Sequence, residues 1–128
     1  MVLDTSAIAA IFLENAGFAS IRNKIAASRD VSIGAPTLVE TNMVLCSRLN
    51  DSLEQDVRTF LLEMEVTVIP FEEVHWREAT AAFLRFGKGR HPAKLNFGDC
   101  LSYATAKVAR KPLLYVGEDF AQTDIIRA

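Results

Sequence analysis

The sequence predicts an α/β domain in which helices cover both faces of a parallel sheet. Short runs rich in valine, isoleucine and leucine alternate along the chain with longer stretches whose apolar residues recur at helical spacing. Apolar, β-branched strands separated by helices are typical of a sheet that is buried on both sides. We therefore expect a three-layer α/β/α architecture with a central parallel sheet of four to five strands.

The first quarter of the chain supplies two of these strands. Met1–Leu3 is the first, and the polar residues after it can accept hydrogen bonds from free N–H groups at the start of a helix, expected over Thr5–Leu13. Phe18–Ala27 also has helical spacing. The β-branched run Val31–Ile33, closed by Gly34, predicts the second strand.

The same alternation continues to the end of the chain. Pro36 suits the first turn of a helix that runs to Asn50. The elements expected after it are a helix at Leu53–Met64, a strand at Val66–Ile69, a helix at Val74–Phe86, a basic loop at Lys88–Leu95, a helix starting at Asn96, a strand at Pro112–Val116 and a brief edge strand at Ile125 and Ile126. Trp76, Phe83 and Phe86 share one helix face, which we interpret as core.

Composition limits the chain to one ordinary globular domain, residues 1–128. It is 50% hydrophobic and 23% charged, with two cysteines. A domain of this size buries roughly two-thirds of the surface of its unfolded chain, so a core can form without disulfides or a structural metal. Disorder, collagen-like repeats and disulfide scaffolds are excluded.

The apolar N-terminal run and the cysteines indicate a cytoplasmic protein. Ala7–Leu13 is too short to span a bilayer and lacks the flanks of a signal peptide. Cys46 and Cys100 lie in helical segments without a cysteine or histidine at ligand spacing. We expect both thiols to be buried as small apolar groups.

The formal net charge of −2 hides an uneven distribution of charge. Between Ala79 and Gly117 there are seven basic residues and a single acid, Asp99, so this stretch carries +6. The rest of the chain carries −8. The basic stretch around Asp99 predicts a surface that attracts phosphate.

Four carboxylates are expected at the carboxyl edge of the sheet, where ligands bind in folds of this class. Asp4 follows the first strand directly, and Glu40 lies in the first turns after the second. Asp99 lies near the start of a helix that runs antiparallel to the strands, and Asp119 follows the last strand.

Each of these acids also suits a structural role at a helix N-terminus. The possible roles are N-caps at Asp4 and Asp119, and capping boxes that pair Glu40 with Thr37 and Asp99 with Asn96. Four carboxylates in one cleft, however, repel one another unless cations neutralise them. Oxygen ligands without histidine or thiolate suit Mg²⁺ or Mn²⁺. Such a metal site typically serves phosphoryl transfer or phosphodiester hydrolysis.

Four short motifs with these acids are spaced along essentially the whole chain. They are Asp4-Thr5-Ser6-Ala7, Glu40-Thr41-Asn42, Leu95-Asn96-Phe97-Gly98-Asp99-Cys100 with Tyr103-Ala104, and Leu113-Leu114-Tyr115-Val116-Gly117-Glu118-Asp119-Phe120 with Thr123-Asp124. In this order and spacing they resemble the PIN-domain ribonucleases, and specifically the VapC-type toxins of bacterial toxin–antitoxin pairs.

The resemblance implies a metal-dependent endoribonuclease that acts as a toxin, forms homodimers and is silenced by a cognate VapB-type antitoxin. It implies that Asp4, Glu40, Asp99 and Asp119 are the acids of the site, with the Ser6 hydroxyl near the metal. Under this hypothesis three of them, Asp4, Asp99 and Asp119, hold one or two Mg²⁺ or Mn²⁺ ions. Glu40 then orients or deprotonates the attacking water.

Two points stay open at this level. Glu118, Asp119 and Asp124 crowd the last motif, so spacing alone does not identify the fourth acid; Asp119 is favoured, then Asp124. Two alternatives are a Mg²⁺-dependent phosphatase or receiver-like domain and a non-catalytic PIN-like protein-binding module. The lack of a second aspartate two residues after Asp4 weighs against the first, and the presence of all four acids weighs against the second. RNA-backbone contacts are expected at Lys88, Arg90 and Lys94, and also at Lys111.

Overall fold

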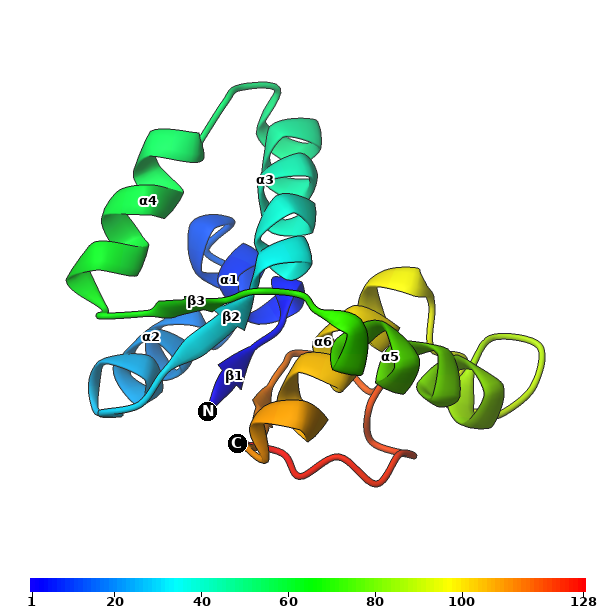
Figure 1. Cartoon of the computed structure of the whole chain (residues 1–128). Helices are drawn as coiled ribbons and strands as arrows, with labels where there is room; N and C mark the ends of the chain where they lie inside the picture. The colour runs from blue at the N-terminus through cyan, green and yellow to red at the C-terminus, as the bar shows by residue number, and fades with distance from the viewer.

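The computed structural model describes all 128 residues, and its centre is a four-stranded parallel sheet (Figure 1). The strands are β1 (Val2–Leu3), β2 (Ser32–Gly34), β3 (Thr67–Ile69) and β4 (Leu113–Leu114), in the order β3-β2-β1-β4. All three strand pairs are parallel. The predicted fold class is therefore confirmed. The expected edge strand at the C-terminus is reduced to one bridge, between Leu113 and Arg127.

Six helices connect and cover the strands, within a few residues of their predicted bounds. They are α1 (Thr5–Phe12), α2 (Phe18–Ala26), α3 (Ala35–Leu49), α4 (Glu54–Glu63), α5 (Glu73–Phe86) and α6 (Phe97–Ala109). Helix α3 begins directly after β2, because Gly34 has an extended backbone and Pro36 lies in the first turn. No helix has the length and apolar character needed to cross a membrane.

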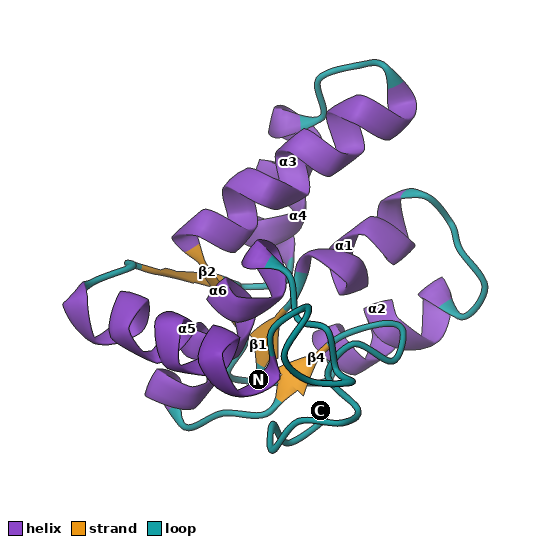
Figure 2. Cartoon of the chain, turned by 90° about the vertical axis from the view of Figure 1, so that its right-hand side faces the viewer, coloured by secondary structure: helices purple, strands orange, loops and turns teal.

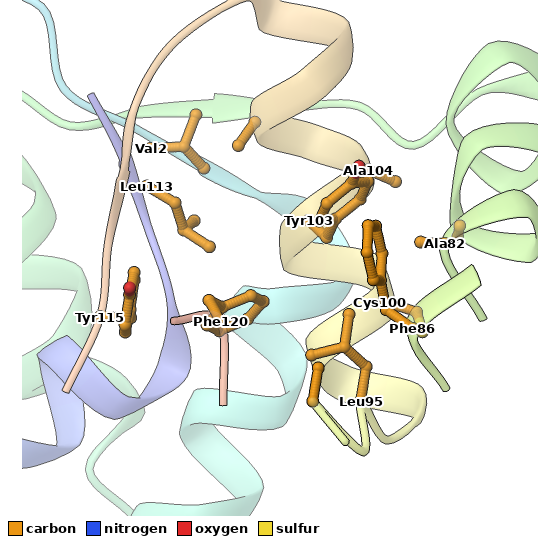
Figure 3. Packing of buried hydrophobic residues seen from close by; sticks show 13 residues of the cluster. Val2, Ala82, Phe86, Leu95, Cys100, Tyr103, Ala104, Leu113, Tyr115 and Phe120 are labelled. Carbon is orange, nitrogen blue, oxygen red and sulfur yellow. The ribbon is translucent and has the colours of Figure 1, made fainter. Parts of the chain in front are cut away.

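Two apolar cores lie on opposite faces of the sheet. Neighbouring side chains of a strand point to opposite faces, so Val2 and Leu113 join one core and Leu3 and Leu114 the other. The first core contains Tyr103 and other residues of α5 and α6 (Figure 3). The second contains residues of α1 to α4. Figure 2 shows α5 and α6 on one side of β1 and β4, with α1 and α2 on the other.

The parallel arrangement brings distant parts of the chain together at the carboxyl ends of the strands. Helix α1 starts two residues after β1, and α3 starts immediately after β2. The segment after β4 leaves from the same edge, because β1 and β4 are parallel neighbours. Helix α6, which leads back to the start of β4, begins there too. Four chain segments therefore converge on one edge of the sheet.

Three of the side chains interpreted as core are on the surface. Cys46 is exposed, and Trp76 and Phe83 are 53% and 41% exposed, whereas Cys100 and Phe86 are buried as expected. The reason is the narrow buried stripe of each helix. Each of the three exposed residues follows a buried neighbour and is turned about 100° away from it around the helix axis.

Candidate active site

Asp4 is fixed by the start of α1. It is the N-cap of this helix, and its Oδ2 accepts hydrogen bonds from the Ser6 backbone N at 2.9 Å and the Ser6 Oγ at 2.5 Å. The Ser6 Oγ in turn accepts a hydrogen bond from the backbone N of Val116, at 3.0 Å, in the segment after β4. Only 5% of Asp4 is exposed. Ser6 thus connects the first acid with the segment that carries the last.

Glu40 reaches the same edge from the second turn of α3. Its Oε2 accepts a hydrogen bond from the Thr5 Oγ1 at 2.6 Å. The alternative that Glu40 forms a capping box with Thr37 is wrong, because α3 already starts at Ala35 and its N-cap, Gly34, has no side chain. The Thr37 hydroxyl lies instead 3.2 Å from the Ser102 hydroxyl.

Asp99 forms the capping box that the sequence allowed. Its Oδ2 accepts a hydrogen bond from the Asn96 backbone N at 2.8 Å, and its own N donates to the Asn96 Oδ1 at 3.0 Å. Burial raises the pKa of Asp99 to about 6, and the charges of Asp4, Asp119 and Glu40 add to this, against the opposing effect of the Asn96 hydrogen bond. The four predicted acids therefore share one electrostatic environment.

Gly98 provides room for Glu40. A Cβ at this position would overlap the carboxylate of Glu40, so glycine lets this carboxylate keep its place against the start of α6. Gly98 was not predicted to have a role. Its position gave a signal, because glycine is unfavourable within the first turn of a helix unless close packing favours it.

The last motif divides between two locations. Asp119 lies in an exposed turn after Gly117, and it is one of the charges that act on Asp99. No helix follows it, so the N-cap alternative for Asp119 is wrong. Phe120, which is 2% exposed, anchors this turn in the core (Figure 3). Glu118 is exposed and makes no hydrogen bond or ion pair through its side chain.

Asp124 is directed into a different cluster. It accepts hydrogen bonds from the Tyr103 hydroxyl at 2.5 Å, Lys107 at 3.1 Å and Arg85 at 3.3 Å. Burial would raise the pKa of Asp124, but the hydrogen bonds from Tyr103 and Lys107 and the nearby cations lower it to about 2. It is not among the charges that act on Asp99. The structure thus brings Asp119, and not Asp124, to the other three acids.

The four acids suit a hydrated divalent cation. None of them forms an ion pair with lysine or arginine, since the four salt bridges of the molecule lie elsewhere. The donors are carboxylate oxygens, with the Ser6 hydroxyl beside them. No three acids, histidines or cysteines are grouped closely enough to ligate one ion by themselves. Mg²⁺ fits such a donor set, because it keeps several waters and needs only one or two carboxylates.

Comparison with known proteins identifies the family. The family model of the PIN domain matches residues 1–126. Ribonuclease VapC28 of Mycobacterium tuberculosis is 40% identical, and the match covers 100% of this chain and 97% of the relative. Ribonuclease VapC of Mycolicibacterium smegmatis is 35% identical, with 98% and 97% covered. The chain belongs to the VapC ribonucleases of the PIN-domain family. The predicted resemblance is confirmed.

Solved structures support the PIN-domain fold independently. VapC20 of Mycobacterium tuberculosis, described as a sarcin–ricin loop cleaving toxin, superposes with a TM-score of 0.80 at 18% identity, covering 99% of this chain and 97% of that chain. A toxin–antitoxin complex from Klebsiella pneumoniae gives 0.71 at 20% identity, covering 99% and 95%. At these identities the likeness establishes the shared fold.

The basic loop of this PIN domain projects between α5 and α6. Its ends pair at Gly87 and Leu95, and Lys88, Arg90 and Lys94 are all exposed. The loop surrounds a hollow of about 530 Å³ with no apolar residue in its lining. Lys111 does not belong to this surface. Its Nζ binds Asp30 Oδ1 at 2.7 Å, at the amino ends of the strands and so at the opposite edge from the acids.

Proposed function

We propose that this PIN domain hydrolyses RNA phosphodiester bonds with a divalent cation, Mg²⁺ or Mn²⁺, as the toxin of a toxin–antitoxin pair. One observation supports the proposal most strongly. Burial and the charges of three neighbouring carboxylates raise the pKa of Asp99, and no lysine or arginine pairs with any of the four acids. A site of this kind favours an external cation. Neither a phosphatase nor a non-catalytic module is favoured by the family or the site.

The proposed roles of the acids follow from their positions. Asp4, Asp99 and Asp119 would hold the cation, directly or through water. When bound, the cation lowers the pKa of a coordinated water and offsets negative charge that develops on the phosphate. Ser6 fixes the orientation of the Asp4 carboxylate through the 2.5 Å hydrogen bond.

Glu40 is proposed to orient the attacking water and to accept its proton. The hydrogen bond from Thr5 holds Oε2, while Oε1 accepts no hydrogen bond from the protein. Gly98, which has no Cβ, leaves the room that Oε1 occupies. Attack by water, rather than by the ribose 2′-hydroxyl, leaves a 5′-phosphate and a 3′-hydroxyl.

The chemistry of the product ends tests this proposal. The purified protein is incubated with a structured RNA, with and without Mg²⁺ or Mn²⁺, and the ends are determined by enzymatic labelling. We expect metal-dependent cleavage that leaves 5′-phosphates, and no cleavage by Asp99→Asn. Ends with 2′,3′-cyclic phosphate would contradict the mechanism. Equal cleavage by wild type and Asp99→Asn would identify a contaminating nuclease.

Lys88, Arg90 and Lys94 are proposed to contact the RNA backbone. Each neutralised phosphate contributes about 0.7 to the salt dependence of binding to single-stranded RNA, so replacing all three by glutamine should reduce the slope by roughly 2. Lys24→Gln on α2 is the control and should leave the slope unchanged. An unchanged slope in the triple variant would remove the loop from the RNA-binding surface.

We also propose a cognate antitoxin and a homodimer as partners of this chain. A structural relative is a toxin–antitoxin complex, which supports the first. Exposed Val39 and Met43 on α3 and Val68 on the edge strand β3 support the second, because they surround an open apolar groove of about 790 Å³. Met43→Glu should shift the mass in solution from dimer to monomer, whereas Leu62→Glu on α4 should not. A monomeric wild type would refute the dimer.

A further inference from the structure

Phe97 is an exposed aromatic side chain at the active site. It is the first residue of α6, two positions before Asp99, and it is 81% exposed, more than any other large apolar side chain of the molecule. An aromatic residue so exposed stabilises nothing in the core. Its position at the acids therefore requires a reason other than folding.

The apolar surface around Phe97 begins at a catalytic carboxylate. Glu40, Gly98 and Phe97 line one side of an open groove of about 900 Å³. A smaller adjoining hollow of about 350 Å³ lies between Phe97 on α6 and Phe83 on α5. Phe97 lines both hollows, so a group bound against its ring lies next to the groove that contains Glu40.

Positive charge lies next to one of the two rings. The guanidinium of Arg90 is 5.4 Å from the centre of the Phe83 ring. A cation thus lies against Phe83, and the carboxylate of Glu40 lines the groove against Phe97. These neighbours match a nucleotide, whose phosphates carry negative charge and whose base has an apolar face.

We propose that Phe97 and Phe83 form a base-stacking subsite for an unpaired nucleotide next to the scissile phosphate. The inference rests on the proposed ribonuclease function and adds to it two residues that bind a base. Bases can stack on protein aromatic rings only when they are free of a helix. Stacking of one base on an aromatic side chain typically strengthens binding by roughly 5- to 150-fold.

Two oligomers of equal charge test the subsite. One is a single-stranded oligouridine, and the other has the same length but abasic riboses, so that only the bases differ. Binding is measured in the Asp99→Asn background to prevent cleavage. Phe97→Leu should weaken binding of oligouridine at least 5-fold and leave binding of the abasic oligomer unchanged. Leucine keeps the apolar area and lacks the π-face.

Conservative and distant variants serve as controls. Phe97→Tyr should bind oligouridine as wild type does, and Leu62→Ala, at a residue 72% exposed on α4, should have no effect. An equal loss for both oligomers would overturn the proposal. So would a change in the oligomeric state of Phe97→Leu, which would assign Phe97 to a contact with another protein chain.

A fluorescent reporter gives an independent measurement. The chain has one tryptophan, Trp76, so Phe97→Trp in a Trp76→Phe background places the only indole in the subsite. Oligouridine should quench its fluorescence and the abasic oligomer should not; equal responses would overturn the proposal. If the wild type cleaves RNA and Phe97→Leu binds oligouridine as tightly as the protein with Phe97, only the subsite is refuted. If the wild type neither cleaves nor binds RNA, the ribonuclease function is refuted as well.

Discussion

Two clusters around aspartates of the last two motifs have opposite electrostatics. At Asp99, burial and three neighbouring carboxylates raise the pKa to about 6. At Asp124, Tyr103, Lys107 and Arg85 surround one carboxylate, and its pKa is lowered to about 2. Asp99 accepts a hydrogen bond from one backbone N–H, whereas Asp124 accepts three from side chains, two of them cationic. The two aspartates therefore differ in burial and in the side-chain donors and cations around them.

The comparison separates a functional site from a structural one. Asp124 has its counter-ions within the protein, and it ties the irregular C-terminal segment to α5 and α6. Asp99 lacks such partners, and the fold keeps it half-buried and close to three other acids at a cost in stability. Sites that cost stability in this way are typical of function.

The largest expected difference is in the rate of cleavage. Asp99→Asn should reduce the single-turnover rate by a factor on the order of 10³, because it removes charge from the proposed cation site. The matched change in the structural cluster, Asp124→Asn, should retain activity within about tenfold. An equal loss of activity in both variants, with circular dichroism showing that both remain folded, would contradict the distinction between the two clusters.

A smaller loss of rate is expected when Glu40 is displaced without changing any acid. In Gly98→Ala the new Cβ would overlap the Glu40 carboxylate. We expect cleavage about 10²-fold slower, because misplacement of a catalytic group by about 1 Å has an effect of this size. Stabilisation by Mg²⁺ should persist, since Asp4, Asp99 and Asp119 are unchanged. Full activity would show that Glu40 has no role in activating water.

Stability without metal should reveal the cost of burying an ionised Asp99 beside three other carboxylates. Because the pKa of Asp99 is raised on folding, the folded state binds more protons, and stability falls as pH rises from about 4 to about 6. At pH 7 Asp99→Asn should be more stable than wild type by about 1–2 kcal/mol after allowance for solvent screening, and equally stable at pH 4 or below. Thermal unfolding at both pH values measures this.

Added metal should invert that order. A cation at 100 times its dissociation constant stabilises the folded state by about 2.7 kcal/mol. Mg²⁺ or Mn²⁺ should therefore raise the melting temperature of the wild type, and should raise that of Asp99→Asn much less. Equal shifts for the two proteins would place the cation elsewhere.

The smallest change in stability is expected from a substitution in the cluster around Asp124. Tyr103→Phe removes one hydrogen bond to Asp124, whose carboxylate can be solvated instead, so unfolding should become easier by about 1 kcal/mol. Tyr115→Phe is the control, because the Tyr115 hydroxyl makes no hydrogen bond within the protein. Stabilisation by Mg²⁺ should be unchanged in both. A lost response to Mg²⁺ in Tyr103→Phe would link the two clusters.

The sequence predicted the acids whose positions depend on local rules. Asp4 follows a strand and caps the next helix, and Asp99 caps α6, so both were located by short-range patterns. Strand order located Glu40 correctly, but the partner considered for it, Thr37, was wrong. The carboxylate of Glu40 is held instead by the hydroxyl of Thr5, which is 35 residues away in the chain. Asp119 and Asp124 could not be separated by spacing alone.

Local patterns of residue type determined the α/β class, the order of elements and the acids at the carboxyl edge, because periodicity and capping act over a few residues. Only the tertiary structure decided which acid belongs to which cluster, why residue 98 is glycine, and which helix faces stay exposed. These depend on contacts between segments far apart in sequence. Asp124 and Asp99 are alike as residues, and what distinguishes them is the set of charges that the fold places around each.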